Sequence, residues 1–280
     1  MRIANPIYDA VFKYLMEDAE IARGLLSKII GEDIVEIAVQ PQEYVGRSNK
    51  FEVIIFRLDF KATIKTKTGK RKKVLIELQK GKNAADIMRF RRYPGDNYRK
   101  EDFVEAENKR VALPIITIYF LGFRLKNITT AVMKVSREYT DLITDKPIIV
   151  EEEFVEKLTH DSYIIQIQRL KKKVRNDIER VLKVFNQAYA TEGDKKMLEF
   201  SENDYADNGL LARMVSRLRK AATEEEILRQ IEIEEEVDNT IEQHIREKQE
   251  LAEKLDELAA ENAALKRRLE TLENQLDEEE

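Results

Sequence analysis

The sequence predicts an α/β fold with a mixed central sheet flanked by helices, followed by a helical connector and a C-terminal coiled coil. Three features of this 280-residue chain lead to that fold class. Apolar runs at 51–66 and 72–80 predict a β-hairpin, because strand side chains alternate between the two faces of a sheet. The continuous apolar run at 115–123 is typical of a central strand covered on both faces. Near the C-terminus, leucine recurs every seven residues, as in a coiled coil.

Helical and extended patterns place the other elements around this hairpin. An amphipathic helix is expected over residues 6–30 and ends at Gly31, since glycine readily adopts the left-handed conformation found after helices. A strand is expected at 34–44, and Gly69 lies in the hairpin turn. The rest of the chain is expected to form, in order, a helix over 84–99 that bends near Pro94, the central strand, short strands within 124–160, a strand at 163–168, and helices at 172–190 and from about 205 to the end.

These elements group into three predicted parts: a globular domain (1–195), a helical connector (196–248) and a coiled coil (249–280). In the last part a single Asn at a core position sets the register and favours two parallel strands, so a homodimer is expected. Charged residues flanking the seam attract across such a dimer, Glu261 to Lys266 and Arg268 to Glu273. Leucine or asparagine fills every core position, namely Leu251, Leu255, Leu258, Asn262, Leu265, Leu269, Leu272 and Leu276.

Two alternatives exist for this zipper. The helix can pack back on the globular domain, although its acidic surface and narrow apolar stripe suit that poorly. A zipper with a core Asn also occurs in dimers whose preceding basic helix enters the DNA major groove. Residues 222–243 are strongly acidic and would be repelled by DNA, which excludes that class of protein.

Composition removes several classes of chemistry. The chain has no cysteine, so disulfides, thiolate zinc sites and thiol catalysis are excluded. Its two histidines, His160 and His244, are far apart in sequence, which argues against a histidine triad or metal cluster. Glycine-rich phosphate loops are absent from the sequence. With no apolar run of about 20 residues and no secretory signal, we expect a cytoplasmic protein without a membrane partner.

Charge is divided unevenly along the chain. Residues 223–280 hold 7 Lys/Arg and 21 Asp/Glu, whereas residues 1–222 carry a net charge of +9. Basic clusters release counterions when they bind a phosphate backbone, so this asymmetry predicts DNA as a partner. Each cluster taken alone is equally typical of a solvated surface. The clusters lie at 65–73, 89–93, 169–175 and 213–220.

Two carboxylates lie in the predicted hairpin, Asp59 and Glu77. Burying an unpaired carboxylate costs several kcal/mol, and proteins pair such groups or give them a metal. Mg²⁺ prefers one or two carboxylates with water and substrate oxygens, which the two residues can supply together with the Leu78 carbonyl. The alternatives are a structural salt bridge to Lys61 or a half-exposed hairpin.

The pattern Asp59, hairpin, Glu77-x-Gln79 resembles the PD-(D/E)xK nuclease superfamily, and most of all its Rpn branch of recombination-promoting, transposase-like nucleases. The resemblance covers about residues 1–190. It includes an N-terminal helix with an Asp and a Lys (NPIYDAVFKYLM), a helix after the hairpin (DIMRFRRYPGDNY), a buried strand (LPIITIYFLGF) and a later apolar strand (SYIIQIQRL). It departs from the superfamily at Gln79, where the motif has Lys.

The resemblance implies a restriction-endonuclease-like fold and a Mg²⁺- or Mn²⁺-dependent DNA endonuclease, and the predicted zipper would make this enzyme a homodimer. Asp59 and Glu77 would bind the metal, and Lys61 and Gln79 rank above Lys80 as the group facing the phosphate, because period two turns Lys80 away from Glu77. The alternative function is a catalytically inactive, nuclease-fold DNA-binding or scaffold dimer.

Further residues follow from the helices around the hairpin. Asp9 would reach the metal or its water, whereas the alternative is a surface ion pair with Lys13, four residues on. Arg89 and Tyr93 either orient the site or pack the helix on the sheet. The residues expected to bind nucleic acid are Lys13, Lys70, Arg71, Lys72, Lys73, Arg89 and Arg92.

Overall fold

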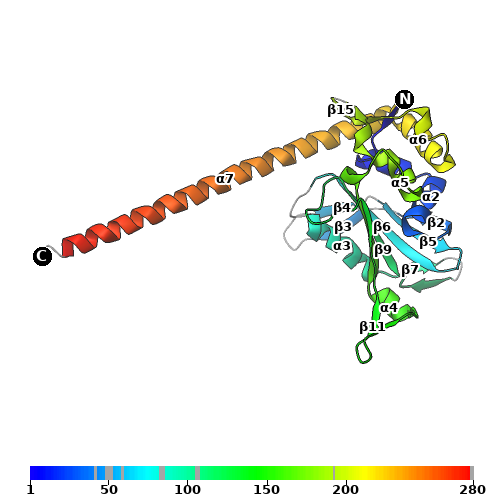
Figure 1. Ribbon diagram of the computed structural model, residues 1–280, viewed down its shortest axis with the longest axis horizontal. Coiled ribbons are helices and arrows are strands. Elements are labelled where there is room, and N and C mark those ends of the chain that lie inside the picture. The colour runs from blue at the N-terminus through cyan, green and yellow to red at the C-terminus, as the bar shows by residue number, and fades with distance from the viewer. Residues whose placement is uncertain are drawn as a thin grey trace. The chain divides into compact units, whose positions relative to one another are not determined.

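The central sheet has six strands in the order β10-β13-β9-β6-β5-β2. This computed structural model describes residues 1–40, 43–47, 53–57, 60–81, 86–104, 108–191 and 193–277. The chain divides into two compact units, Met1–Ile231 and Glu232–Glu280. The first unit holds the sheet and the helices packed on it (Figure 1).

Three neighbouring strands of the sheet run in the same direction. β9 (Ile115–Leu121) lies between β6 (Arg71–Gln79) and β13 (His160–Gln166) and pairs parallel to both, which confirms the predicted central strand. The outer strands, β10 (Val132–Val135), β5 (Phe60–Thr66) and β2 (Ile34–Val39), pair antiparallel. The carboxyl ends of β6, β9 and β13 therefore meet at one edge of the sheet.

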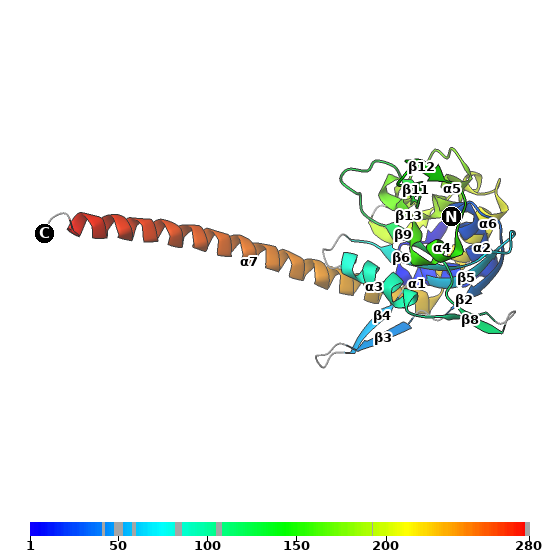
Figure 2. The same ribbon diagram turned by 90° about the horizontal axis from the view of Figure 1, so that it is seen from below.

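The predicted hairpin forms from Phe60 onward. β5 pairs with β6 from Phe60↔Ile76 to Lys65↔Arg71, and Gly69 in the turn has a φ of 85°. The start of the predicted strand 51–66 is wrong, because β4 (Val53–Arg57) pairs with β3 (Glu43–Arg47) as a separate hairpin (Figure 2). Strand periodicity does not show that the pairing partner changes within one apolar run.

Side chains alternate along the hairpin as period two requires. Phe60, Ala62 and Ile64 enter the main core, whereas the residues between them face the other side of the sheet. The main core is completed by aromatic packing, with the rings of Phe12 and Phe120 5.6 Å apart between centroids. Helices α1, α2, α5 and α6 cover this side, and α3 covers the other side (Figure 1).

The predicted helix 6–30 is two helices, α1 (Asp9–Met16) and α2 (Ala19–Ile30). Asp18 causes the break, because its extended backbone and its side chain cap α2 by accepting from the N–H groups of Glu20 and Ile21. The predicted end is confirmed, since Gly31 adopts a φ of 79° at the C-terminus of α2.

α3 (Asp86–Tyr98) confirms the helix predicted after the hairpin, and it continues through Pro94. The connection onward to β9 contains a short hairpin, β7 (Asp102–Val104) with β8 (Lys109–Val111). Between β10 and β13 the chain forms the hairpin β11 (Tyr139–Asp141) and β12 (Lys146–Ile148), then the short helix α4 (Glu153–Leu158). These short elements match the irregular region expected over 124–160.

The segment after β13 differs most from the prediction. The helix expected at 172–190 is reduced to α5 (Asp177–Val181), followed by 3₁₀ turns. β15 (Asp194–Glu199), which the sequence pattern did not reveal, pairs with β14 (Ala190–Thr191) and with β1 (Arg2–Ala4). One 3₁₀ turn, η2 (Ile167–Arg169), precedes α5, and those after it are η3 (Leu182–Phe185), η4 (Gln187–Tyr189) and η5 (Glu202–Asp204).

The predicted connector does not match the compact units. α6 (Gly209–Ala221) buries Leu211, Met214 and Leu218 in the main core, so it belongs to the first unit. The helix predicted from about 205 to the end is interrupted after α6, and α7 (Glu225–Asp277) then runs continuously into the second unit. None of the helices in the described ranges combines the length and apolar character that a membrane span requires.

Candidate active site on the α3 side of the sheet

Glu77 lies in β6 on the side of the sheet that α3 covers, and its side chain is only 2% exposed. Period two directs it away from Ile76 and Leu78, which belong to the main core. Its surroundings are mostly apolar and aromatic, consisting of Leu75, Phe90, Tyr93, Pro94, Thr117 and Tyr119. The predicted burial of this carboxylate within the hairpin is thereby confirmed.

The aromatic residues around Glu77 come from both the sheet and α3. Tyr119 is the direct neighbour of Glu77 in the parallel ladder, and its ring centroid lies 5.2 Å from that of Phe90. Burial raises the pKa of Tyr119, a hydrogen bond with Thr117 lowers it, and the negative charge of Glu77 raises it further. Tyr93, 3% exposed, packs against Leu75. Tyr93 thus packs α3 on the sheet, and its role in orienting the site stays a prediction.

Gln79 follows Glu77 on the same side of β6 and is also largely buried. Its side-chain amide donates to the Gly81 carbonyl at 3.0 Å. Its backbone carbonyl accepts from the N–H of Gly122 at 2.7 Å, where the chain leaves β9. A methyl group on Gly122 would lie 2.5 Å from the Lys80 carbonyl oxygen, so this close approach requires glycine.

Lys61 lies on β5, one strand away from Glu77, and points to the same side of the sheet. Its surroundings include Asp102 and Lys100. Burial lowers the pKa of Lys61; the carboxylate of Asp102 opposes this shift, and the ammonium of Lys100 adds to it. The prediction that Lys61 shares a side with Glu77 is confirmed.

The partner carboxylate predicted for Glu77, Asp59, lies outside the described residues. It directly precedes Phe60 in the sequence, and Phe60 pairs with Ile76, the residue before Glu77. Lys80 behaves as its strand position predicts, because its ammonium lies 3.8 Å from the ring centre of Tyr8, a main-core residue.

Asp9 and Lys13 form an ion pair of 2.6 Å on α1, as the surface alternative proposes. The apolar side of α1 packs in the main core, on the opposite side of the sheet from Glu77. The role of Asp9 at a metal stays a prediction.

The cations at the hairpin turn are bound by carboxylates of the fold. Lys70 pairs with Glu151, and Lys72 pairs with Glu32 at 2.5 Å. Lys73 is 1% exposed and pairs with Asp102 at 2.7 Å, so its predicted role in binding nucleic acid is wrong. These cations also lie at the far end of β6: five residues separate Lys72 from Glu77, about 17 Å at the strand rise of about 3.3 Å per residue.

The remaining predicted cations lie on α3. Arg92 is exposed there, and the side chain of Arg89 lies outside the described residues. In the part of the chain that the structure describes, three or more His, Cys, Asp or Glu residues do not gather around a possible metal position.

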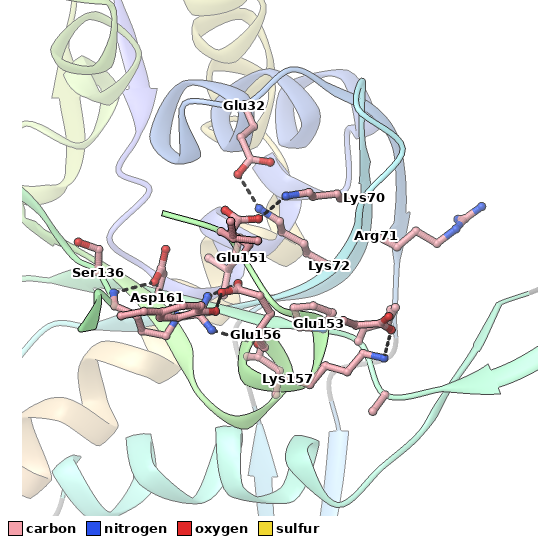
Figure 3. A pocket seen from close by; sticks show the side chains of 18 of the residues that line it. Glu32, Lys70, Arg71, Lys72, Ser136, Glu151, Glu153, Glu156, Lys157 and Asp161 are labelled. Carbon is pink, nitrogen blue, oxygen red and sulfur yellow. Dashed lines mark hydrogen bonds and ion pairs between the residues drawn. The ribbon is translucent and has the colours of Figure 1, made fainter. Parts of the chain in front are cut away.

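A larger pocket, of about 870 Å³, lies at the other end of the parallel strands (Figure 3). Its centre is a charge network that sequence patterns do not signal, in which Arg137 binds Asp161 at 3.1 Å and Glu156 at 2.6 Å. Figure 3 shows two further ion pairs among the residues that line the pocket, Lys157–Glu153 and Lys72–Glu32. Because its cations and carboxylates pair with each other, this pocket does not present a single sign of charge to a ligand.

Comparisons with protein-family models, with curated proteins and with solved structures found no significant match.

Proposed function

We propose that this chain is a metal-dependent DNA endonuclease that acts as a homodimer. The observation that carries the proposal is the buried Glu77 carboxylate, which β6 presents on the α3 side of the sheet. Lys61 lies on the same side of the next strand, β5. A carboxylate among Leu75, Phe90 and Tyr93 contributes little to packing. Such a group, next to a half-buried lysine, is typical of a site that performs chemistry.

The order of elements also supports the proposal. An N-terminal helix, the hairpin β5–β6, the helix α3, the buried strand β9 and the later strand β13 follow one another, as the resemblance to the Rpn branch implies. Glu77 and Gln79 occupy adjacent outward positions of the second hairpin strand, β6.

Glu77, with Asp59 as its predicted partner, supplies the hard oxygen ligands that Mg²⁺ or Mn²⁺ prefers. The bound metal would supply charge neutralisation and an activated water for phosphodiester hydrolysis. Lys61 would hold its ammonium toward a phosphoryl oxygen and stabilise the negative charge that develops there. Gln79, whose amide now donates to Gly81, would turn that donor toward the phosphate. The aromatic residues around Glu77 would exclude bulk water from the reacting groups.

The homodimer rests on the second unit. Leu251, Leu255, Leu258 and Leu265 are between 54% and 60% exposed along α7 in the single chain. Burying one leucine stabilises a complex by about 1.5–3 kcal/mol, so this stripe favours pairing with a second copy. Two copies would bring two sites together, as cutting both strands of a duplex requires.

The test is cleavage of supercoiled plasmid by the full chain with Mg²⁺, Mn²⁺ or EDTA. Glu77→Gln and Asp59→Asn are expected to lower metal-dependent cleavage more than about 100-fold, because each removes a metal ligand. Glu36→Gln is the matched control, since Glu36 is an exposed carboxylate of the same sheet that pairs with Lys65. Full activity of Glu77→Gln, or no cleavage with either metal, would refute the proposal.

A second function, a catalytically inactive DNA-binding dimer, is favoured by the hydrogen bond from the Gln79 amide to the Gly81 carbonyl, because it directs an N–H of the residue at the motif position to the backbone. Metal-independent DNA binding without cleavage would establish it.

A further inference from the structure

Two groups of cations in the first unit differ in their ion pairing, a difference that the sequence does not show. In the hairpin turn, Lys70 pairs with Glu151 and Lys72 pairs with Glu32. A second group, Lys126, Lys171, Lys172 and Lys173, is exposed, and within the described residues none of its members forms an ion pair. We call these four lysines the basic ridge.

The basic ridge lies at the same end of the sheet as Glu77. The ladders place Gln79 beside Leu121, and Leu121 beside Gln166, at the carboxyl ends of the three parallel strands. The ridge follows β9 and β13 directly: Lys126 is five residues after Leu121, and Lys171 is five residues after Gln166. β11 and α4 lie at the other end of the sheet (Figure 1). Two strand spacings of about 4.8 Å separate Gln79 from Gln166.

The two loops that carry the ridge are joined by partly buried hydrogen bonds. Gln166, fully buried, accepts from the N–H of Leu125 at 2.7 Å and donates to the Thr130 carbonyl at 2.6 Å. Arg169 donates to the Leu125 carbonyl at 3.1 Å. The backbone next to Lys126 is thereby joined to the segment that precedes Lys171, which holds the two ridge loops beside each other.

We propose that the basic ridge binds the phosphate backbone of duplex DNA and leads it to the edge of the sheet where Glu77 and Gln79 lie. The inference deepens the proposed nuclease function and rests on it for the meaning of the site. Charge complementarity identifies DNA as the partner. Lysines without an ion pair among the described residues, on two loops that are joined to each other, release counterions when they contact successive phosphates. Lys70 and Lys72 of the hairpin turn, which already have carboxylate partners, gain less from the same contact.

The test measures binding of a fluorescent 20-base-pair DNA by anisotropy in EDTA, where metal-dependent cleavage cannot occur. The variant carries Lys171→Gln, Lys172→Gln and Lys173→Gln. The matched control removes the same charge at the turn, with Lys70→Gln, Arg71→Gln and Lys72→Gln. Tyrosine-fluorescence melting of both variants checks that the fold is retained. A single-stranded RNA of equal length is measured beside the DNA.

The ridge variant is expected to lower the slope of log affinity against log salt by about 2.7, about 0.9 for each lost phosphate contact, while the control changes it by less than about 1. Equal slopes for the two variants, absence of duplex binding at low salt, or binding of the RNA alone would overturn the inference. The anisotropy assay does not depend on cleavage, so the two proposals can fail separately. If the ridge variant lowers the slope but the full chain does not cleave plasmid, only the nuclease function is refuted. If the full chain cleaves plasmid but the ridge variant leaves the slope unchanged, only the ridge is refuted.

Discussion

Asp102→Asn is expected to destabilise the first unit strongly, because two lysines, Lys73 and Lys61, share the Asp102 carboxylate. Its closest contact is the ion pair with Lys73 at 2.7 Å, with side chains 1% and 7% exposed. The Asp102 carboxylate also attracts Lys61, and the ammonium of Lys100 repels both Lys61 and Lys73. Without Asp102, Lys73 would be a buried ammonium with like charges beside it.

Removing one partner of a buried ion pair costs about 3–5 kcal/mol, because the remaining charge is left uncompensated. A unit of this size loses about 2–4 °C in melting temperature per kcal/mol, so Asp102→Asn is expected to melt on the order of 10 °C lower. Lys73→Met is expected to cost less, since Asp102 keeps the attraction of Lys61.

The pH dependence of Asp102→Asn tests the same reasoning. Burial lowers the pKa of Lys73, and Asp102 opposes that shift. Without Asp102 the pKa falls further below its value in the unfolded chain, so the unfolded state binds more protons between the two pKa values. Stability then rises with pH, and the deficit relative to wild type narrows as pH increases from 7 toward 10.

Urea unfolding followed by tyrosine fluorescence suits this measurement. All ten tyrosines lie in residues 1–231 and the chain has no tryptophan, so the signal reports the first unit alone. A loss below about 1 kcal/mol for Asp102→Asn, or a larger loss for Lys73→Met, would refute the shared-carboxylate explanation.

The remaining predictions concern the zipper, Gly122 and Asp204. Deleting residues 249–280 is expected to convert the proposed homodimer into a monomer that still nicks plasmid but makes few double-strand breaks. Asn262→Leu is expected to raise the melting temperature and to give a mixture of oligomeric states. Sedimentation and gel assays check both variants. Gly122→Ala is expected to destabilise by about 1–3 kcal/mol in urea, because the added methyl group meets the Lys80 carbonyl. Asp204→Asn is expected to lower the free energy of unfolding by roughly 1–3 kcal/mol at pH 7, because burial raises the pKa of Asp204 but hydrogen bonds from Lys183 and Ser201 hold it low. The stability that this carboxylate contributes is present above its pKa in the unfolded chain and is lost as pH falls. In acid-unfolding curves the difference in stability between wild type and Asp204→Asn therefore narrows toward pH 2.

Local patterns predicted the hairpin and the side to which its residues point. Period two alone places Glu77 and Gln79 on one side of β6 and Lys80 on the other, because side-chain direction in a strand depends only on position. Glycine at 31 and 69 marked a helix end and a turn for a similar reason, since both need a positive φ that glycine adopts without strain.

Pairing between distant segments was decided by the tertiary structure. β1 pairs with β15, with Arg2 opposite Glu199. These two residues are almost 200 positions apart, so a local sequence pattern cannot show that they pair. The same applies to charge. Lys72 and Lys172 look alike in sequence, but Glu32 lies 2.5 Å from the first, whereas the second contacts the ring of Tyr189. Whether a lysine is neutralised depends on which carboxylate the fold brings to it, and Coulomb attraction acts over distance in space, not along the chain.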